Sequence, residues 1–177
     1  MAGAPRTALV AALGVLLSLA VQGSPAAPQA QAAPVFTVLS GLLSISVAPT
    51  ATLTTTGSTA TGSLGTTTVI DGRLGAASYD VSVSTAGFDL VGATFSNTAT
   101  HIPPSATTVR DTAVTGGTAS STSSVALPSA SPIFRVTYPS SVLTVNLVST
   151  YTMSMTLTVP AAAASGLYTG TVTQTVA

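Results

Sequence analysis

The most regular pattern in the chain is an alternation of apolar and hydroxylic residues near its C-terminal end. From Tyr151 to Val159 every odd-numbered residue is apolar and every even-numbered residue is serine or threonine. A period of two is typical of a β-strand with one buried face, whereas a helix would place apolar residues three and four positions apart. Tyr168–Val176 alternates in the same way, with Gly170 and Gln174 interrupting its apolar positions. Both segments are predicted strands, and the residues between them allow either direct pairing or an arch between two sheets.

Weaker versions of this pattern run through the rest of the chain, where β-branched residues favour the pleated surface. Residues 53–63 are rich in Gly, Thr and Ser and are expected to form a turn region around Gly57 and Gly62, and Asp71-Gly72 is a hairpin-type turn signal. Many short strands without a helical window predict an all-β protein, an antiparallel β-sandwich, with a β-barrel as the alternative. The other expected strands are 39–47, 64–70, 79–83, 107–114, 125–127, 133–138 and 142–147.

The alternation also predicts which side chains form the core. Met153 and Met155 share the apolar face of their strand, and long flexible side chains of this kind fill core space well. The predicted core comprises the odd residues 151–159 with Tyr168, Val172 and Val176, and a set of apolar plugs beneath a less regular region, namely Phe88, Leu90, Phe95 and Ile102.

The N-terminal end is typical of an export leader. Arg6 precedes the uncharged apolar run Thr7–Val21, which is shorter than the roughly 20 residues of a membrane span. A tract rich in Pro, Ala and Gln follows, in which Ala30-Gln31-Ala32 fits a signal-peptidase site, with cleavage after Gly23 or Ala27 as alternatives. We therefore expect residues 1–33 to be a signal peptide with its cleavage region and residues 34–177 to be a single domain. The expected location is secreted, extracellular or cell-wall-associated.

Composition narrows the possible partners. The chain has no cysteine, so disulfides cannot hold the exported fold together. Its only charged side chains are four arginines and four aspartates, and loss of Arg6 would leave three arginines. So few cations argue against nucleic acid or an anionic membrane as the main partner. No transmembrane segment is expected after leader removal.

No catalytic or metal-binding pattern is evident. The single histidine, His101, lies beside Ile102-Pro103-Pro104 and no Gly-x-Ser-x-Gly elbow is present, so a hydrolase would need His101 to contact both a serine and an aspartate. Asp71 is expected to cap its turn or pair with Arg73. Neither a metal-ligand spacing nor a phosphate-binding loop occurs, so we expect no enzyme activity, no metal and no cofactor. General acid–base catalysis by a pair of carboxylates would require two of the four aspartates, Asp71, Asp80, Asp89 and Asp111.

Two patches of sequence carry a family resemblance. Residues 68–73 (TVIDGR), with residues 78–84 (SYDVSVS) and Phe88, resemble the WxL-domain surface proteins of Gram-positive bacteria and their actinobacterial relatives, in which a D-x-R turn precedes an aromatic-led strand. Residues 157–173 are similar to that family's closing pattern. The family is named for two Trp-x-Leu elements; this chain has no tryptophan, and Tyr79-Asp80-Val81 and Gln174-Thr175-Val176 stand in those places. The resemblance implies an immunoglobulin-like or WxL-like sandwich, secreted or held loosely and non-covalently at the cell wall.

Together these features predict a non-catalytic secreted or cell-envelope-associated protein whose partners are cell-wall glycan or other surface proteins. One alternative is a module that binds wall glycan through Tyr79, Tyr168 or two rows of hydroxyl groups. Another is a pilin-like assembling subunit in which Val35–Val38 adds a strand to a neighbour. The two hydroxyl rows are Thr152, Ser154, Thr156 and Thr158 on one predicted strand and Thr169, Thr171, Thr173 and Thr175 on the other.

Overall fold

The computed structural model describes residues 13–21, 43–73, 78–120, 123–129, 132–139 and 147–177. Apart from one 3-10 turn, Pro104–Ala106, every regular element among them is a strand. No helix in these ranges is long and apolar enough to cross a membrane. The strands are β1 Leu13–Val21, β2 Leu43–Ser46, β3 Thr50–Thr56, β4 Thr59–Asp71, β5 Ser78–Thr85, β6 Phe88–Leu90, β7 His101–Ile102, β8 Thr107–Thr115, β9 Thr118–Ala119, β10 Val125–Ala126, β11 Phe134–Thr137, β12 Leu147–Thr158 and β13 Gly166–Val176.

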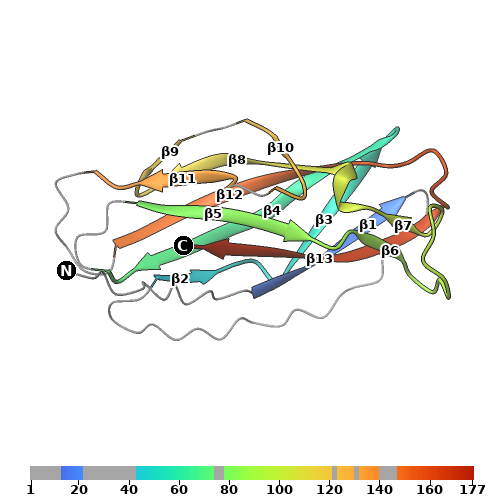
Figure 1. Ribbon diagram of the computed structural model, residues 1–177, viewed down its shortest axis with the longest axis horizontal. Helices are drawn as coiled ribbons and strands as arrows, with labels where there is room; N and C mark the ends of the chain where they lie inside the picture. The colour runs from blue at the N-terminus through green and yellow to red at the C-terminus, as the bar shows by residue number, and fades with distance from the viewer. Residues whose placement is uncertain (1–12, 22–42, 74–77, 121–122, 130–131, 140–146) are drawn as a thin grey trace, which may run out of the picture.

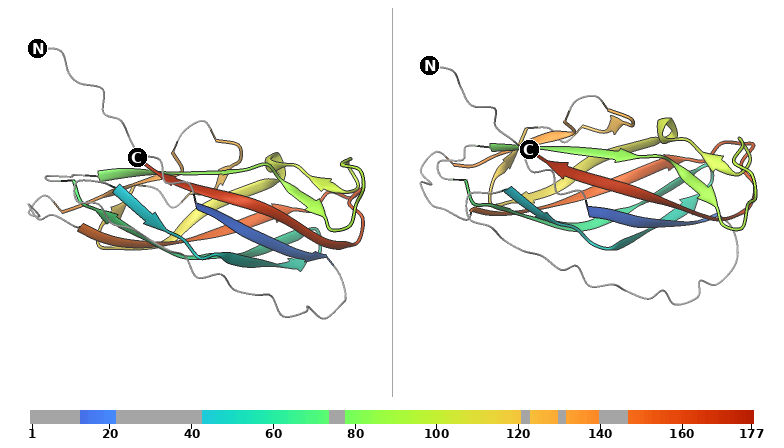
Figure 2. Two further views of the ribbon diagram at one scale, coloured as in Figure 1. Left: turned by 90° about the horizontal axis from the view of Figure 1, so that it is seen from below. Right: turned by 60° about the horizontal axis from the view of Figure 1, so that its bottom comes forward.

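The strands form two layers that face each other across one core (Figures 1 and 2). One layer has the order β10-β8-β12-β4-β3, with β2 also on β4. The other has the order β13-β5-β11-β9, with β6 on β13 and β7 on β6. Strand β1 pairs with both β3 and β13 and so joins the layers along one side, whereas β10 and β9 at the two far ends do not pair. The predicted β-sandwich is confirmed, and the closed barrel is not formed.

The two strands of strict alternation lie in opposite layers. β12 is central, with Met155 opposite Gly62 of β4 and Val109 of β8. β13 pairs with β1, β5 and β6 instead, so the chain arches between the sheets after β12. The predicted inside positions are buried except Val159, which follows the last residue of β12 and is only partly covered. The buried members of the two strands are Tyr151, Met153, Met155, Leu157, Tyr168, Val172 and Val176.

The two interruptions on β13 each have a structural reason. Gln174 is buried, and its Oε1 accepts hydrogen bonds of 3.0 Å from the Thr67 and Tyr151 hydroxyls of the opposite layer. A buried polar group is tolerated when it is hydrogen-bonded, and these two bonds also link the two sheets. A Cβ at Gly170 would collide with the Phe88 ring, 2.7 Å from its Cδ1. Glycine at this position lets Phe88 pack against the β13 backbone.

The turn predicted at Gly57 is confirmed, whereas the turn predicted at Gly62 and the hairpin predicted at Asp71-Gly72 are not formed. Most of residues 53–63 belong to β3 and β4, which form a hairpin closed at Gly57, where φ is +61°. Gly62 is a strand residue at which an added Cβ would meet the Thr52 carbonyl and the Leu53 side chain. Threonine accounts for this outcome, because its β-branched side chain suits a strand even in a low-complexity segment. Asp71-Gly72 does not close a hairpin, since β4 and β5 lie in different layers.

Other predicted strands agree in place but not always in extent. Residues 107–114 fall within β8, and β10 and β11 lie inside 125–127 and 133–138. The first predicted strand is represented by β2, and its residues 39–42 lie outside the described residues. Residues 142–146 of another predicted strand also lie outside them. Residues 13–21, within the predicted leader, form β1.

Candidate functional site at the Phe95 tip

The two tyrosines considered for glycan stacking lie in the core. Tyr79 is 1% exposed and shares a 2.7 Å hydrogen bond with the Ser149 hydroxyl. Tyr168 is fully buried, and its hydroxyl lies 2.7 Å from the Ala99 carbonyl and 2.9 Å from that of Ala164. Burial raises the pKa of both phenols, because it disfavours the charged form. Neither ring offers a face on which a sugar could stack.

The hydroxyl rows do not form one surface. Thr152–Thr158 belongs to β12 and Thr169–Thr175 to β13, and these strands lie in different layers. Members of each row are partly or fully exposed, as expected for the outer face of a sheet. A ligand would therefore meet one row at a time.

The four aspartates are separated, each in its own environment. Asp71 is bound by Arg73 through two hydrogen bonds, 2.8 Å from Nε and 2.7 Å from Nη2, which confirms the predicted pair. Asp80 on β5 meets Arg135 on β11 at 2.7 and 2.8 Å, and these bonds lower the pKa of Asp80. Asp71, Asp80 and Asp89 each contact a basic side chain and not another carboxylate. Among the described residues no three potential ligands gather to hold a metal ion.

Asp111 on β8 is the buried acid without an arginine across from it. Its side chain lies on the inner face of the sheet, with Met153 opposite on β12. Desolvation raises the pKa of this carboxyl, and a backbone hydrogen bond and the charge of neighbouring Arg110 only partly offset that effect. The folded state therefore binds the proton more tightly than the unfolded state. Asp111 disfavours folding at pH values above its folded pKa, and this penalty fades as the pH falls toward the unfolded value.

We expect Asp111→Asn to stabilise the protein at neutral pH, because the amide removes a poorly solvated charge while keeping the shape of the side chain. The melting temperature should rise by about 2–4 °C at pH 7, the usual response of a domain of this size to about 1 kcal/mol. The gain should shrink toward pH 4, because wild-type Asp111 then becomes progressively protonated and loses its charge. Thermal melts at both pH values test this. A variant that melts below the wild type at pH 7 would contradict it.

His101 pairs with Asp89 across the β6/β7 ladder, with 2.7 Å between Nδ1 and Oδ1. The ring also lies over Gly87, where φ is +105° and an added Cβ would approach the imidazole to 2.8 Å. Among the described residues, no serine hydroxyl is hydrogen-bonded to His101. The histidine–carboxylate pair thus lacks the nucleophile contact that a hydrolase would require.

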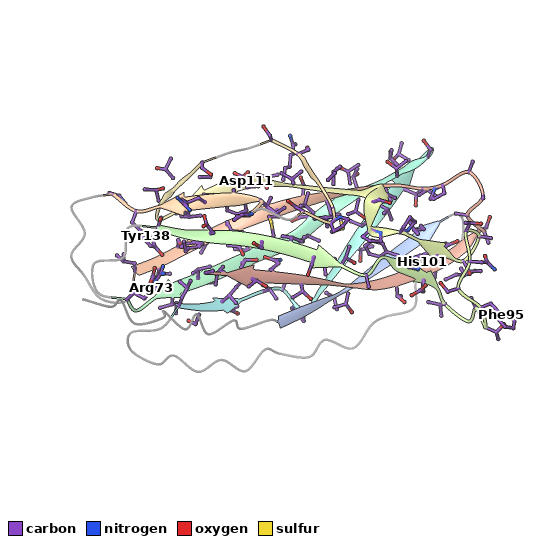
Figure 3. All side chains as sticks on the ribbon, viewed as in Figure 1. Arg73, Phe95, His101, Asp111 and Tyr138 are labelled. Atoms are coloured by element: carbon purple, nitrogen blue, oxygen red, sulfur yellow. The ribbon has the colours of Figure 1, made fainter. Side chains whose placement is uncertain are left out.

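An exposed apolar tip lies next to this pair, in the connection between β6 and β7. Phe95 is 77% exposed and Val91 is 55% exposed, and Phe95 projects from one end of the sandwich (Figure 3). The prediction of Phe95 as a core plug is therefore wrong, although Phe88 and Ile102 are buried as predicted. The chain leaves the sheet after Leu90 and turns at Gly92, where φ is +84°. The surface around Phe95 forms a shallow depression of about 320 Å³ lined by Leu90, Val91, Gly92, Ala93, Thr94, Phe95, Asn97 and Thr100.

Hydrogen bonds hold this tip in one shape. The Thr100 hydroxyl donates to the Phe95 carbonyl at 2.6 Å and accepts the Asn97 N–H at 3.1 Å. Asn97 Oδ1 accepts the Ala99 N–H at 2.8 Å. The Leu90 N–H donates to the Thr100 carbonyl, which ties the base of the loop to β6. A loop braced in this way needs little ordering of its backbone on binding, which lowers the entropic cost of binding.

The buried Tyr168 supports the tip from below. Its hydroxyl contacts the Ala99 carbonyl, and that carbonyl also accepts the Ala164 N–H at 2.8 Å. The Val91 N–H donates to the Leu167 carbonyl at 2.8 Å. Tyr168 therefore has a structural role, fixing the loop that carries Phe95. The exposure of Phe95 was not predicted from the sequence. The local signals for a turn are Gly92 and Asn97, which lie on either side of it.

Residues 79–81 and 174–176 are neighbours in the structure. β5 and β13 pair antiparallel, with Val81 opposite Val176. Asp80 and Ala177 exchange backbone hydrogen bonds of 2.9 and 3.1 Å. The sequence alone did not predict this contact.

No protein-family model, curated protein or solved structure matches this chain.

Proposed function

We propose that this chain is a non-catalytic, exported cell-envelope protein that attaches to its partner through the Phe95 tip. The observation that carries the proposal is an aromatic ring left in solvent on a loop that is braced by Thr100, Asn97 and Tyr168. An exposed aromatic group on a braced loop is the kind of side chain that contributes strongly to binding energy at interfaces. Export is supported by the N-terminal leader pattern, and a non-catalytic role by the dispersed acids.

Glycan binding is the second candidate, and the same ring favours it. The apolar face of a sugar packs on an exposed aromatic ring, and nearby polar groups can meet its hydroxyls. Asn97 and Thr100 line the depression beside Phe95. On this hypothesis the aromatic contact moves from Tyr79 and Tyr168, which are buried, to Phe95.

Sedimentation with isolated cell walls tests the attachment. We expect the exported protein to sediment with the walls, and Phe95→Ser to bind about tenfold more weakly or worse, since losing a central aromatic contact costs at least about 1.4 kcal/mol. Val148→Ser is the matched control, because Val148 is also 55% exposed but lies on β12. Binding should change little with salt, because few charges are involved. Equal binding by wild type and Phe95→Ser would refute the role of the tip.

Stripping the walls with protease before the assay separates the two candidates. Binding that survives stripping and still depends on Phe95 indicates wall glycan as the partner. Binding that disappears indicates a surface protein. A protein that stays in the supernatant with intact walls contradicts attachment altogether.

A further inference from the structure

Strand β1 has an unusual place between the two layers. It runs antiparallel to β13, with Leu13–Val21 opposite Gln174–Gly166, and parallel to β3, with Leu16–Ala20 opposite Thr50–Thr54. Among the described strands it is the only one that pairs with a strand of each layer. Figure 1 shows it as the blue strand between β3 and β13.

This strand consists of residues from the predicted leader. Leader removal, which is part of the function proposed above, would remove β1, and β3 and β13 would then each have one edge without a hydrogen-bonded neighbour. Buried Leu53, Tyr168 and Val172 lie at register positions opposite β1 residues and would lose that neighbour. Unpaired strand edges over a hydrophobic core readily accept another strand.

We propose that the space between β3 and β13 is a strand-acceptor slot, held by residues 13–21 in the precursor and filled after export by residues 35–39 of a second copy. The donor segment is Val-Phe-Thr-Val-Leu, which follows the predicted cleavage region. It is uncharged and rich in β-branched and aromatic residues, as an inserted strand requires. Phe36 and Val38 share one face and are assigned to the core side, and Thr37 to the outer side.

The topology prevents a copy from filling its own slot in the orientation of β1. Leu43 lies opposite Asp71 of β4, whereas Thr54 lies opposite Thr61. Asp71 and Thr61 are ten residues apart along β4, so Leu43 and Thr54 are separated by about 33 Å along the sheet, at a rise of about 3.3 Å per residue. A strand of residues 35–39 in the slot would end near the level of Thr54, and the four steps from residue 39 to Leu43 reach about 14 Å at most. A donor from a second copy meets no such limit, and repeated exchange gives head-to-tail assembly.

The experiment starts from the full chain, exported by a secreting host and purified from the medium. Intact mass shows whether the leader has been removed, and light scattering over a range of concentrations gives the oligomeric state. We expect leader-free wild type to form multimers that grow with concentration. Val38→Asp should be monomeric, because a charge on the core side blocks insertion, and the matched control Thr37→Asp should still assemble.

A peptide of residues 34–42 provides a second measurement. It should bind the folded Val38→Asp monomer, whose slot is open, and bind wild-type multimers at least about tenfold less well. A thermal melt of Val38→Asp establishes that the variant is folded.

The outcomes separate the slot from the proposed function. Leader-free protein that is monomeric at every concentration and ignores the peptide overturns strand exchange while export stands. A mass that retains the leader overturns leader removal, and with it an open slot. Equal assembly of Val38→Asp and Thr37→Asp overturns the donor assignment. Wall binding through Phe95 is measured independently of all three.

Discussion

Met155→Asp is expected to abolish folding of the domain at neutral pH. Met155 is fully buried at the middle of β12, between strands on both sides. Losing the buried thioether removes about 1.5–3 kcal/mol of hydrophobic stabilisation. An unpaired carboxylate in the core adds several kcal/mol more, so the sum approaches the whole stability of a typical domain, about 5–15 kcal/mol.

The adjacent substitution Thr156→Asp is the matched control. Thr156 lies on the outer face of the same strand and is partly exposed, so the same charge there can remain hydrated. Circular dichroism and thermal melts of the two variants should show an unfolded Met155→Asp and a folded Thr156→Asp. Similar melting temperatures for both variants would mean that the two faces of β12 are wrongly assigned.

Arg73→Ala is expected to produce the second-largest loss. The Asp71 side chain is fully buried and receives two side-chain hydrogen bonds and the backbone N–H of Arg73, and the same guanidinium donates to the Ser78 carbonyl at 2.9 Å. Removing the arginine leaves a buried carboxylate without its counter-ion, a change that costs about 3–5 kcal/mol in a fully buried pair. Because Arg73 is partly exposed, water replaces some of the lost contact and we expect about 2–3 kcal/mol.

This loss should lower the melting temperature by about 5–10 °C. Arg135→Ala is the matched control, since Arg135 makes a similar two-bond contact with Asp80 at an exposed position and should barely change the melt. Adding Asp71→Asn to Arg73→Ala should restore part of the stability by removing the buried charge. If Arg73→Ala melts like Arg135→Ala, the Asp71–Arg73 contact contributes little to the fold.

Several features could be predicted because they depend on residues close in sequence. The two faces of β12 follow from alternating Tyr151–Leu157, since successive side chains of a strand point to opposite sides. The Asp71–Arg73 pair needs only a two-residue separation and a turn. The sandwich follows from many short strands without helices. The predicted burial of Val159 is not observed, because the alternation continues in the sequence past Thr158, the last residue of β12.

The candidate site depended on contacts that no local pattern contains. Phe95 resembles a core residue in the sequence, and only the route of the chain after Leu90 places it in solvent. Tyr168 is an aromatic residue with a hydroxyl group and could have been a binding residue, yet the packing of β13 buries it beneath Ala99. Exposure of a lone aromatic is decided by what packs above it, and those neighbours are distant in sequence.

The sequence by itself determined the strand class, the buried face of β12 and most of β13, and the Asp71–Arg73 pair. The tertiary structure alone decided that β12 and β13 lie in opposite layers, that Gln174 joins those layers, and that Asp80 meets Arg135. It also placed β1 between β3 and β13. The physical reason is that side-chain alternation arises within one strand, whereas pairing depends on the path of the connections and on the burial gained across the whole core.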